Sequence, residues 1–295
     1  MEAISVAVRR GGTVESRHRV HAVAVEDGQV AGAAGDPQLV TFFRSSAKPL
    51  QALPLVRARD DLDSADLAIA CASHQGEDAQ IEAVRRLLVK APSTEDDLEC
   101  GFDEGRPRER IYHNCSGKHA GFLAVCRTRQ WPLAGYRLSD HPLQRELAAE
   151  ICEAAGLSRD GVDMATDGCG VVTFGLPIEA MAASFARLPT LEGGERIADA
   201  MREHPGLVGG AGAIDTDLMR ALPGWTAKRG GEALLCAVSG EGLAVAAKVE
   251  DGSPRALRPA LARFLSELGI PIGEEFSRVA VVNSRGEEVG EVVPE

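Results

Sequence analysis

A serine and a lysine stand three positions apart at Ser45 and Lys48, in the segment RSSAKPLQ. Residues at this spacing are neighbours on one face of a helix, with about 5–6 Å between their Cβ atoms. A lysine at that distance can take the proton of the serine hydroxyl and so turn it into a nucleophile. The spacing therefore predicts a Ser-Lys pair for acyl transfer, although most such pairs on helices only face water.

The neighbouring residues place this pair at the start of a helix. Lys48 precedes Pro49, and proline is tolerated in the first turn of a helix but not in its interior. The apolar residues before Ser45, from Val40 to Phe43, indicate a strand. Free N–H groups and the positive end of the helix dipole would then lie near the hydroxyl. The alternative is that Ser45 only caps the helix.

Three later segments also bring polar side chains to the ends of expected elements. CASHQGE contains Ser73, either a second active hydroxyl or part of a helix cap, and His74, either a base or an ordinary hydrogen-bonded residue. HNCSGKHAG contains Cys115 and precedes a helix, as a ligand-binding loop or a plain helix start would. DGCG contains Cys169. Two cysteines are too few for a structural zinc site, so buried inert thiols are the default interpretation.

Two lysines near the C-terminal strands are further candidates. Lys228 begins KRGGE, which precedes an expected strand and is similar to the K-x-G box of enzymes with an S-x-x-K serine, the β-lactamases and penicillin-binding proteins. Lys248 ends the apolar run that starts at Leu243. A lysine in that position is usually solvated. If it entered the site instead, burial and neighbouring cations would lower its pKa toward that of a base.

Composition narrows the possible partners. The chain has 295 residues and a net charge of −12, without a basic block, which argues against nucleic acid as the main partner. No apolar run is long enough to span a membrane. Residues 1–10 lack the features of a signal peptide, and the seven cysteines suit reduced thiols. We therefore expect a cytoplasmic protein that neither inserts in membranes nor binds nucleic acid.

The periodicity predicts strands at both ends of the chain and helices between them. We expect an N-terminal antiparallel group that includes residues 39–43, with a turn at Asp27-Gly28. Helices are expected at 46–58, 77–90, 118–129, 142–155, 177–186, 194–203, 213–221 and 257–268, and strands at 233–238, 243–249, 278–283 and 287–293. This is an α+β layout, in which both chain ends build one antiparallel sheet. We expect a single catalytic domain over 1–295, with a sheet lobe at about 1–45 and 222–295 and a helical lobe at about 46–221.

Taken together, the segments resemble the rhizobial-type, thermolabile L-asparaginases of the asparaginase II family. The ordered set RSSAKPLQ, CASHQGE, YHNCSGKHAGF, DHPLQ, TDGCG, GGAG…DTDLM, KRGGE and LAVAAKV carries the resemblance over most of the chain. It implies a fold like that of serine β-lactamases and glutaminases, and hydrolysis of asparagine to aspartate and ammonia. Two positions depart from the family pattern, Val172 in place of a proline and Ala213 in place of an arginine.

The resemblance also implies roles for individual residues. It makes Ser45 with Lys48, and Ser73 with Lys248, the two Ser-Lys tandems. It assigns a Zn²⁺ ion to three residues beside the substrate. The expected zinc ligands are Cys115, Lys118 and Cys169.

We expect five further residues to contact the substrate. Glu232 is the candidate partner for the α-ammonium of a free amino acid, because that group needs an anion; it could equally be a solvated charge. The other candidates are Arg44, His74, Gly117 and Asp167. We also expect a homodimer. A penicillin-recognising serine hydrolase and a non-catalytic module that binds an amino acid or zinc are the alternatives.

Overall fold

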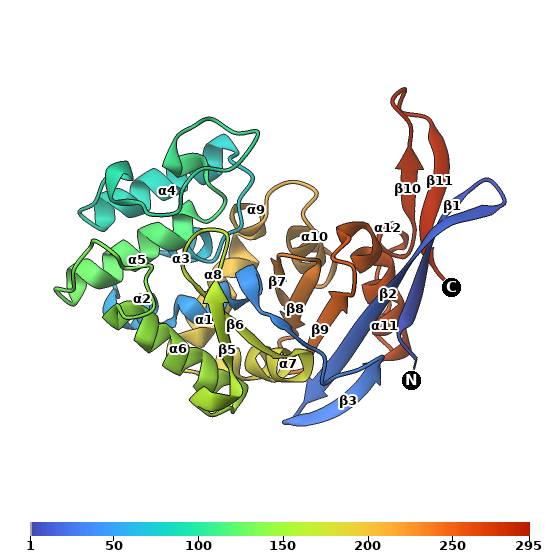
Figure 1. Cartoon of the computed structure of the whole chain (residues 1–295), viewed down its shortest axis with the longest axis horizontal. Coiled ribbons are helices and arrows are strands. Elements are labelled where there is room, and N and C mark those ends of the chain that lie inside the picture. The colour runs from blue at the N-terminus through green and yellow to red at the C-terminus, as the bar shows by residue number, and fades with distance from the viewer. Residues whose placement is uncertain (1) are drawn as a thin grey trace.

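The computed structural model describes residues 2–295, and a large antiparallel sheet dominates one side of it (Figure 1). Within these residues the sheet has eight strands in the order β10-β11-β1-β2-β9-β8-β7, and β3 pairs with β2. The strands are β1 (Ile4–Arg10), β2 (Thr13–Glu26), β3 (Gln29–Ala34), β7 (Thr226–Gly230), β8 (Leu234–Val238), β9 (Ala244–Val249), β10 (Val279–Val282) and β11 (Glu288–Pro294). The prediction of an α+β fold with a sheet built from both chain ends is confirmed.

Local sequence explains the hairpins of this sheet. Asp27 and Gly28 both have positive φ, 49° and 73°, as the tight turn between β2 and β3 requires. The two chain ends meet where β1 pairs with β11, with Val6 opposite Pro294. Every residue of β8 and β9 is buried, so both faces of the sheet are covered at its centre. Helices α7 (Ile178–Arg187) and α11 (Leu257–Glu267) pack against these central strands.

The remaining helices gather beside the sheet (Figure 1). Two prolines divide the helical segment after Ser45 into short pieces, because Pro49 and Pro54 each occupy a first-turn position. The sequence correctly predicts the full helix that starts at Pro142, which ends at Gly156 with a left-handed φ of 67°. The helices are α1 (Lys48–Gln51), α2 (Leu53–Ala58), α3 (Ser64–Ala70), α4 (Asp78–Lys90), α5 (Ser116–Thr128), α6 (Pro142–Ala155), α8 (Gly194–Glu203), α9 (Pro205–Val208), α10 (Ile214–Ala221) and α12 (Glu274–Ser277).

Short 3₁₀ helices connect several of these elements. They are η1 (Arg44–Ala47), η2 (Glu95–Asp97), η3 (Arg110–Tyr112), η4 (Arg159–Gly161), η5 (Leu188–Thr190) and η6 (Pro254–Ala256). Of these, η1 carries the first candidate serine.

A second sheet of three strands corrects the expected N-terminal group. Strand β4 (Val40–Phe42) pairs with β6 (Val172–Pro177), which also pairs with β5 (Asp163–Thr166). Residues 39–43 therefore do not join the N-terminal hairpins, because the chain turns away from the large sheet at Gly35, whose φ is 77°. β6 is almost fully buried and holds β4 directly before η1. This small sheet positions the start of η1.

Two elements near the candidate residues are not predicted from the sequence patterns. Helix α3 begins with a capping box between Asp63 and Asp66 and is not among the helices that the sequence predicts. Strand β7 contains Lys228, whereas the sequence places that residue before a strand. The expected border between the lobes at residue 221 is also interrupted, since α7 packs on the large sheet. Among the described helices, none has the length and apolar character needed to cross a lipid bilayer.

Candidate active site

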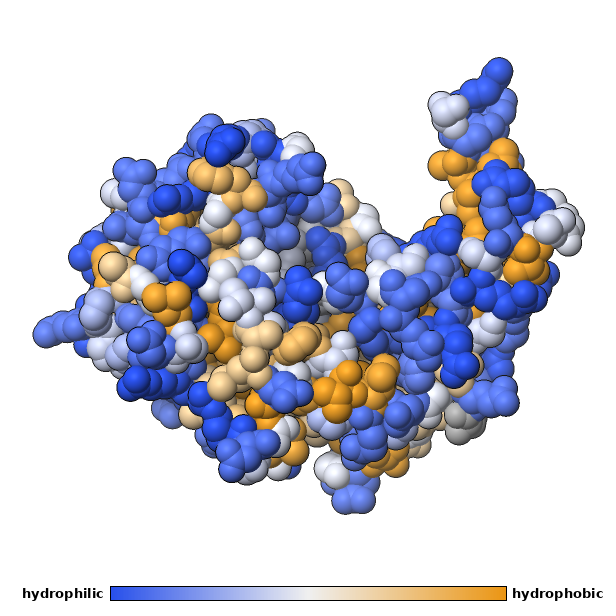
Figure 2. Space-filling view, viewed as in Figure 1, coloured by the Kyte–Doolittle hydropathy of each residue, from blue (hydrophilic) through white to orange (hydrophobic). Residues whose placement is uncertain are grey.

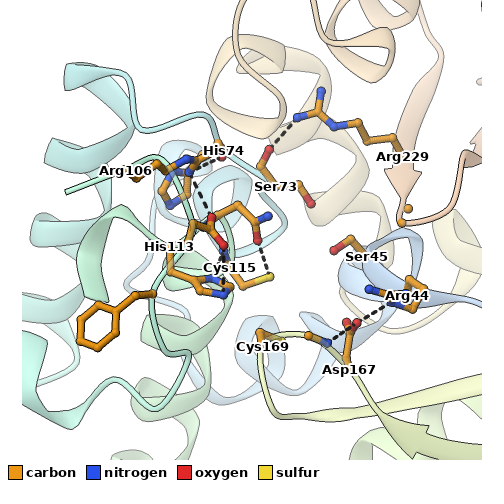
Figure 3. Close-up of a pocket in the computed structure, with 16 residues that line it drawn as sticks. Arg44, Ser45, Ser73, His74, Arg106, His113, Cys115, Asp167, Cys169 and Arg229 are labelled. Atoms are coloured by element: carbon orange, nitrogen blue, oxygen red, sulfur yellow. Dashed lines mark hydrogen bonds and ion pairs between the residues drawn. The ribbon is translucent and has the colours of Figure 1, made fainter. Parts of the chain in front are cut away.

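A polar cavity of about 310 Å³ lies where η1, the end of α3, the start of α5 and the end of β7 meet (Figure 3). Ser45 and Ser73 both line it, together with Cys115 and Cys169. The other lining residues are Arg44, His74, Phe102, Asp103, Arg106, His113, Asn114, Asp167, Gly168, Arg229, Gly230 and Gly231. Tertiary folding thus brings together five stretches that are far apart in the sequence, namely residues 44–45, 73–74, 102–115, 167–169 and 229–231.

Ser45 sits in the first turn of η1, as the sequence predicts for the helix start. The residue before it, Arg44, has a φ of 49°, a region that side-chain-bearing residues rarely adopt. The turn is held against β6, because the Phe43 N–H donates to the Phe174 carbonyl at 2.7 Å and the Arg44 N–H donates to the Thr173 hydroxyl at 3.2 Å. A held, strained turn presents the Ser45 hydroxyl to the cavity.

Lys48 is fully buried and points at Ser73. Its ammonium donates to the Ser73 hydroxyl at 3.0 Å and to the Ala72 carbonyl at 2.5 Å. The hydrogen bond of Lys48 therefore goes to Ser73 rather than to Ser45, although the two serines share the cavity. The i, i+3 spacing does not capture this arrangement because Ser45 belongs to a 3₁₀ turn and Lys48 to the next helix.

Ser73 is fixed by its backbone as well as by Lys48. Its N–H donates to the Val208 carbonyl at 2.9 Å, and its own carbonyl accepts a 2.9 Å bond from the Arg229 guanidinium (Figure 3). The helix-cap interpretation of Ser73 does not describe it, since α4 is capped by Glu77 and Gln80 instead.

The structure does not bring Lys248 to Ser73. Lys248 lies on β9 opposite Leu234, and its ammonium donates to the carbonyl of its neighbour Val249. It lines a separate cavity with Glu232, Glu250 and Asp251. Burial lowers its pKa, against the opposing effect of these carboxylates. The prediction that Lys248 enters the site is wrong in its geometry, because β8 separates its strand from β7.

Lys228 is the second lysine near the serines. It is fully buried on β7, and its ammonium donates to the Asp215 carboxylate at 3.2 Å and to the Arg229 carbonyl at 2.9 Å. Burial lowers the pKa of Lys228 to about 7, the Asp215 charge opposes that shift, and the positive charge of Lys48 adds to it. The similarity of KRGGE to a K-x-G box is the sequence signal that points to this residue.

Arg44 and Asp167 form an ion pair at the cavity wall, with 2.5 Å between Arg44 Nε and Asp167 Oδ1 (Figure 3). Burial alone would raise the pKa of Asp167, but the charges of Lys118 and Arg44 outweigh it and hold that pKa below its usual value. Both residues were predicted as substrate contacts. They offer a cation and an anion side by side, as a zwitterionic amino acid requires.

His74 lines the cavity, but both nitrogens of its imidazole already have hydrogen-bond partners. Nδ1 accepts the Gly76 N–H at 3.2 Å, so the proton lies on Nε2, which is 2.8 Å from the Ser116 hydroxyl. Burial lowers the pKa of His74 to about 3, and the ring is neutral at physiological pH. The base interpretation is therefore disfavoured, and the ring fixes the start of α5.

Gly117 and Glu232 do not occupy the predicted places. A side chain at Gly117 would overlap the carbonyl oxygen of Ile69, so this glycine lets α5 pack closely on α3. Glu232 lies outside the cavity that contains Ser45 and lines two neighbouring cavities instead. Its backbone has a φ of 54°, which turns the chain between β7 and β8.

The three predicted zinc ligands do meet. The Lys118 ammonium lies 3.1 Å from Cys169 Sγ, and the neighbouring Cys115 thiol donates to the Asn114 side-chain oxygen at 2.9 Å. The nearby Cys115 thiol and the charge of Lys118 lower the pKa of Cys169 well below its usual value, against the effect of burial. Burial would lower the pKa of Lys118, but the two sulfur atoms outweigh it and raise it.

This donor set fits zinc chemically. Two thiolates are soft anionic ligands, and a neutral amine can supply a third, which leaves an open position. Within residues 2–295 no group of three or more His, Cys, Asp or Glu side chains is arranged to hold a metal ion. The candidate ligands fall outside that description because the third is a lysine. All seven cysteines are free thiols.

The cavity thus contains the half-buried Ser45 and a second serine, Ser73, that is hydrogen-bonded to the buried Lys48. Lys228, whose pKa is about 7, is buried on β7 outside the cavity lining. Residues 6–294 match the model of the L-asparaginase II family, and the chain belongs to that family.

Two other comparisons were made. The chain is 16% identical to a β-lactamase from Mycobacterium bovis, with a TM-score of 0.38 over 84% of this chain and 94% of that one. A comparison with curated proteins finds no match.

Proposed function

We propose that this protein hydrolyses the side-chain amide of L-asparagine to aspartate and ammonia through an acyl-enzyme on Ser45. The observation that supports it most is the Lys48–Ser73 hydrogen bond of 3.0 Å, beside Ser45 in one polar cavity, in a chain of the L-asparaginase II family. A serine and a buried lysine at this distance suit acyl transfer without a histidine base.

In the proposed mechanism, the Ser45 hydroxyl attacks the amide carbon and passes its proton to a neutral lysine. Lys228 is able to be neutral near pH 7, and Lys48 with Ser73 provides a path for protons within the cavity. In the first turn of η1 the Arg44 N–H donates to the Thr173 hydroxyl and the Ser46 N–H to the Phe43 carbonyl, so the Ser45 N–H is the backbone group that would stabilise the oxyanion. Ammonia leaves with a proton returned from the lysines. Water then attacks the acyl carbon, gives up its proton to the same base, and releases aspartate and Ser45.

Arg44 and Asp167 are the proposed contacts for the amino-acid end of the substrate. Arg44 would hold the α-carboxylate, and the free oxygen of Asp167 would accept from the α-ammonium. Both groups line the cavity that contains Ser45. This pairing replaces Glu232, which lies in other cavities.

We also propose that Cys115, Lys118 and Cys169 hold Zn²⁺. When bound, the ion would act as a Lewis acid that orients a substrate oxygen. Cys169→Ala should then abolish zinc content and weaken apparent affinity for asparagine more than it lowers the maximal rate. Elemental analysis of protein purified without chelator or metal column tests this. Absence of zinc at neutral pH, with no effect of added zinc on melting temperature, would contradict it.

The central experiment is ammonia release from asparagine and from glutamine, for the unaltered protein and for Ser45→Ala. Asparagine should be hydrolysed, and the substituted protein should lose at least about 10³-fold in rate while keeping its melting temperature. Near-normal turnover by folded Ser45→Ala would sink the mechanism. Hydrolysis of nitrocefin but not of asparagine would favour a penicillin-recognising hydrolase instead.

A cytoplasmic homodimer is the proposed assembly. Val40 and Phe42 on β4 are 55% and 39% exposed. Figure 2 shows patches of apolar residues on the face of the molecule that it draws. A second copy would cover such side chains. Sedimentation equilibrium should give twice the chain mass of 31.1 kDa. A single-chain mass at micromolar concentration would contradict the dimer.

A further inference from the structure

The segment GGAG…DTDLM has no role in the mechanism above. Its Asp215 nevertheless contacts Lys228 directly and is connected to Ser73 through Arg229. Asp215, the second residue of α10, is fully buried. Its carboxylate accepts from the Lys228 ammonium at 3.2 Å and from the Arg229 N–H at 3.2 Å, and it lies 3.4 Å from the Arg229 guanidinium. One carboxylate therefore contacts two consecutive residues of β7.

Arg229 connects Asp215 to Ser73. Its guanidinium donates to the Ser73 carbonyl at 2.9 Å and to the Gly209 carbonyl at 3.3 Å. The residue before Gly209, Val208, accepts the Ser73 N–H at 2.9 Å. Asp215 is thus the common anchor of the strand that carries Lys228 and of the loop that carries Ser73.

The approach of Asp215 depends on a glycine. A Cβ atom at Gly209 would overlap Asp215 Oδ1 and lie 2.8 Å from the Ala213 Cβ. The hydroxyl of the next residue, Thr216, donates to the Pro205 carbonyl at 2.8 Å, which holds the first turn of α10 against α9. The local backbone is therefore built around the buried carboxylate.

We propose that Asp215 is a positioning residue that holds Lys228 and Arg229 in place beside the loop of Ser73 and, through its negative charge, favours the protonated form of Lys228. This inference rests on the proposed function. Asp215 does not line the cavity, so it acts through its neighbours rather than on the substrate.

The charges around Lys228 make the direction of the effect definite. Burial and the positive charges of Lys48 and Arg229 favour neutral Lys228, and Asp215 is the anion that opposes them. Burial would raise the pKa of Asp215 itself, but the charges of Lys228 and Arg229 hold it below the usual value. Cys71 after α3 and Cys236 on β8 are the titratable groups beside Lys228, and Arg202 on α8 contacts Thr226 of the same strand. The packed elements also carry Glu195, Arg196, Asp199 and Glu203 on α8, Asp217 and Arg220 on α10, and Arg44 on η1.

The test is the pH profile of ammonia release from asparagine by Asp215→Asn, with Asp217→Asn as the matched control. Asp217 lies on the same helix and pairs with Arg258, away from Lys228. In Asp215→Asn the side chain keeps a hydrogen-bond acceptor but carries no negative charge, so the pKa of Lys228 should fall. We expect the acid limb of kcat/KM to move to lower pH by about 1–3 units, and the plateau to drop at least about tenfold. Asp217→Asn should leave the profile unchanged.

A second readout does not depend on turnover. Asp215→Asn leaves protonated Lys228 without its anion, so the loss of melting temperature should be larger at about pH 6 than at about pH 9, where Lys228 is neutral. In the Lys228→Met background this difference between the two pH values should vanish. The double variant Asp215→Asn/Lys228→Met should melt at a higher temperature than Asp215→Asn alone.

These outcomes separate the two proposals. A fall in plateau without movement of the acid limb, or an equal shift in Asp217→Asn, overturns the role of the Asp215 charge. If Asp215→Asn does not fold, failure of the double variant to recover folding overturns it as well. Failure of the unaltered protein to hydrolyse asparagine would sink the proposed function, while the pH-dependent melting coupling would still decide whether Asp215 controls Lys228.

Discussion

Three lysines are candidates for the base, and burial and partners distinguish them. Lys48 bonds to Ser73, Lys228 bonds to Asp215, and Lys248 bonds only to the carbonyl of Val249. Burial brings the pKa of Lys228 to about 7, against the opposing charge of Asp215, so a useful fraction of its amine is neutral at physiological pH. A base must have lost its proton before it can act.

Substitution of Lys228 and Lys248 should therefore have unequal effects. Lys228→Met is expected to lower kcat for asparagine at least about 10²-fold, in the range typical of a general base. Lys248→Met should keep kcat within about threefold, since its strand lies beyond β8 from the cavity. Ammonia release at several asparagine concentrations measures both. Loss of turnover in Lys248→Met with an unchanged melting temperature would reverse the assignment.

The pKa of Lys228 predicts how the activity of the unaltered protein depends on pH. In the proposed mechanism a neutral lysine accepts the Ser45 proton; Lys228 is protonated below about pH 7, and its neutral amine predominates above it. Activity should rise through this pH and reach a plateau on the alkaline side. His74, with a pKa of about 3, should contribute nothing in this range. A profile that falls with pH would contradict a lysine base.

Among the helices, the close packing of α5 on α3 fixes how far apart the cavity residues Ser73, after α3, and Cys115, before α5, lie. Gly117 lies in the first turn of α5, against the carbonyl of Ile69 near the end of α3. The two helices carry Lys118 and lead into Ser73, so their separation sets the distance between the thiol cluster and the serines. Any side chain at position 117 must push them apart.

Gly117→Ala should consequently destabilise the protein by about 3 kcal/mol, the upper end of the usual range for overpacking. Gly12→Ala is the matched control, because a Cβ atom there meets nothing within 4 Å. That change should stay within about 0.5 kcal/mol. Urea denaturation at constant pH compares the two. Equal stability of both variants would mean that α5 can move away from α3 without cost.

Over the chain as a whole, the two ends stabilise each other. β11 lies between β10 and β1, and it buries Val292 against the sheet while Phe276 is buried just before β10. The last residue, Glu295, donates its N–H to the Ser5 carbonyl at 2.9 Å and pairs with Arg17 at 2.8 Å. The sheet edge at β1 depends on this C-terminal segment for its partner.

Deletion of residues 278–295 should lower the melting temperature strongly, since it removes two strands and leaves β1 with an unpaired apolar edge. Glu295→Gln should lower the melting temperature much less, because exposed ion pairs contribute little. Thermal unfolding of the three proteins tests this. A truncated chain as stable as the full one would show that the last two strands are dispensable.

Much of this architecture is readable from local sequence, because turns, caps and helix periodicity depend on neighbouring residues. Asp27-Gly28 predicts the hairpin, and Pro142 with Gly156 predicts both ends of α6. The family resemblance likewise identifies Ser45, Ser73, Cys115 and Cys169, all of which line one cavity.

Strand order lies beyond such local signals. A lysine in or before a buried strand looks the same in sequence whether it lies opposite Leu234 and His21, as Lys248 does, or opposite Cys236 and beside a buried carboxylate, as Lys228 does. The choice between them depends on which strand lies against η1, and β7 does so while β9 lies two strands away. That contact joins residues more than 180 positions apart, and it exists because the large sheet buries its apolar faces only when both chain ends and the α7 segment pack together.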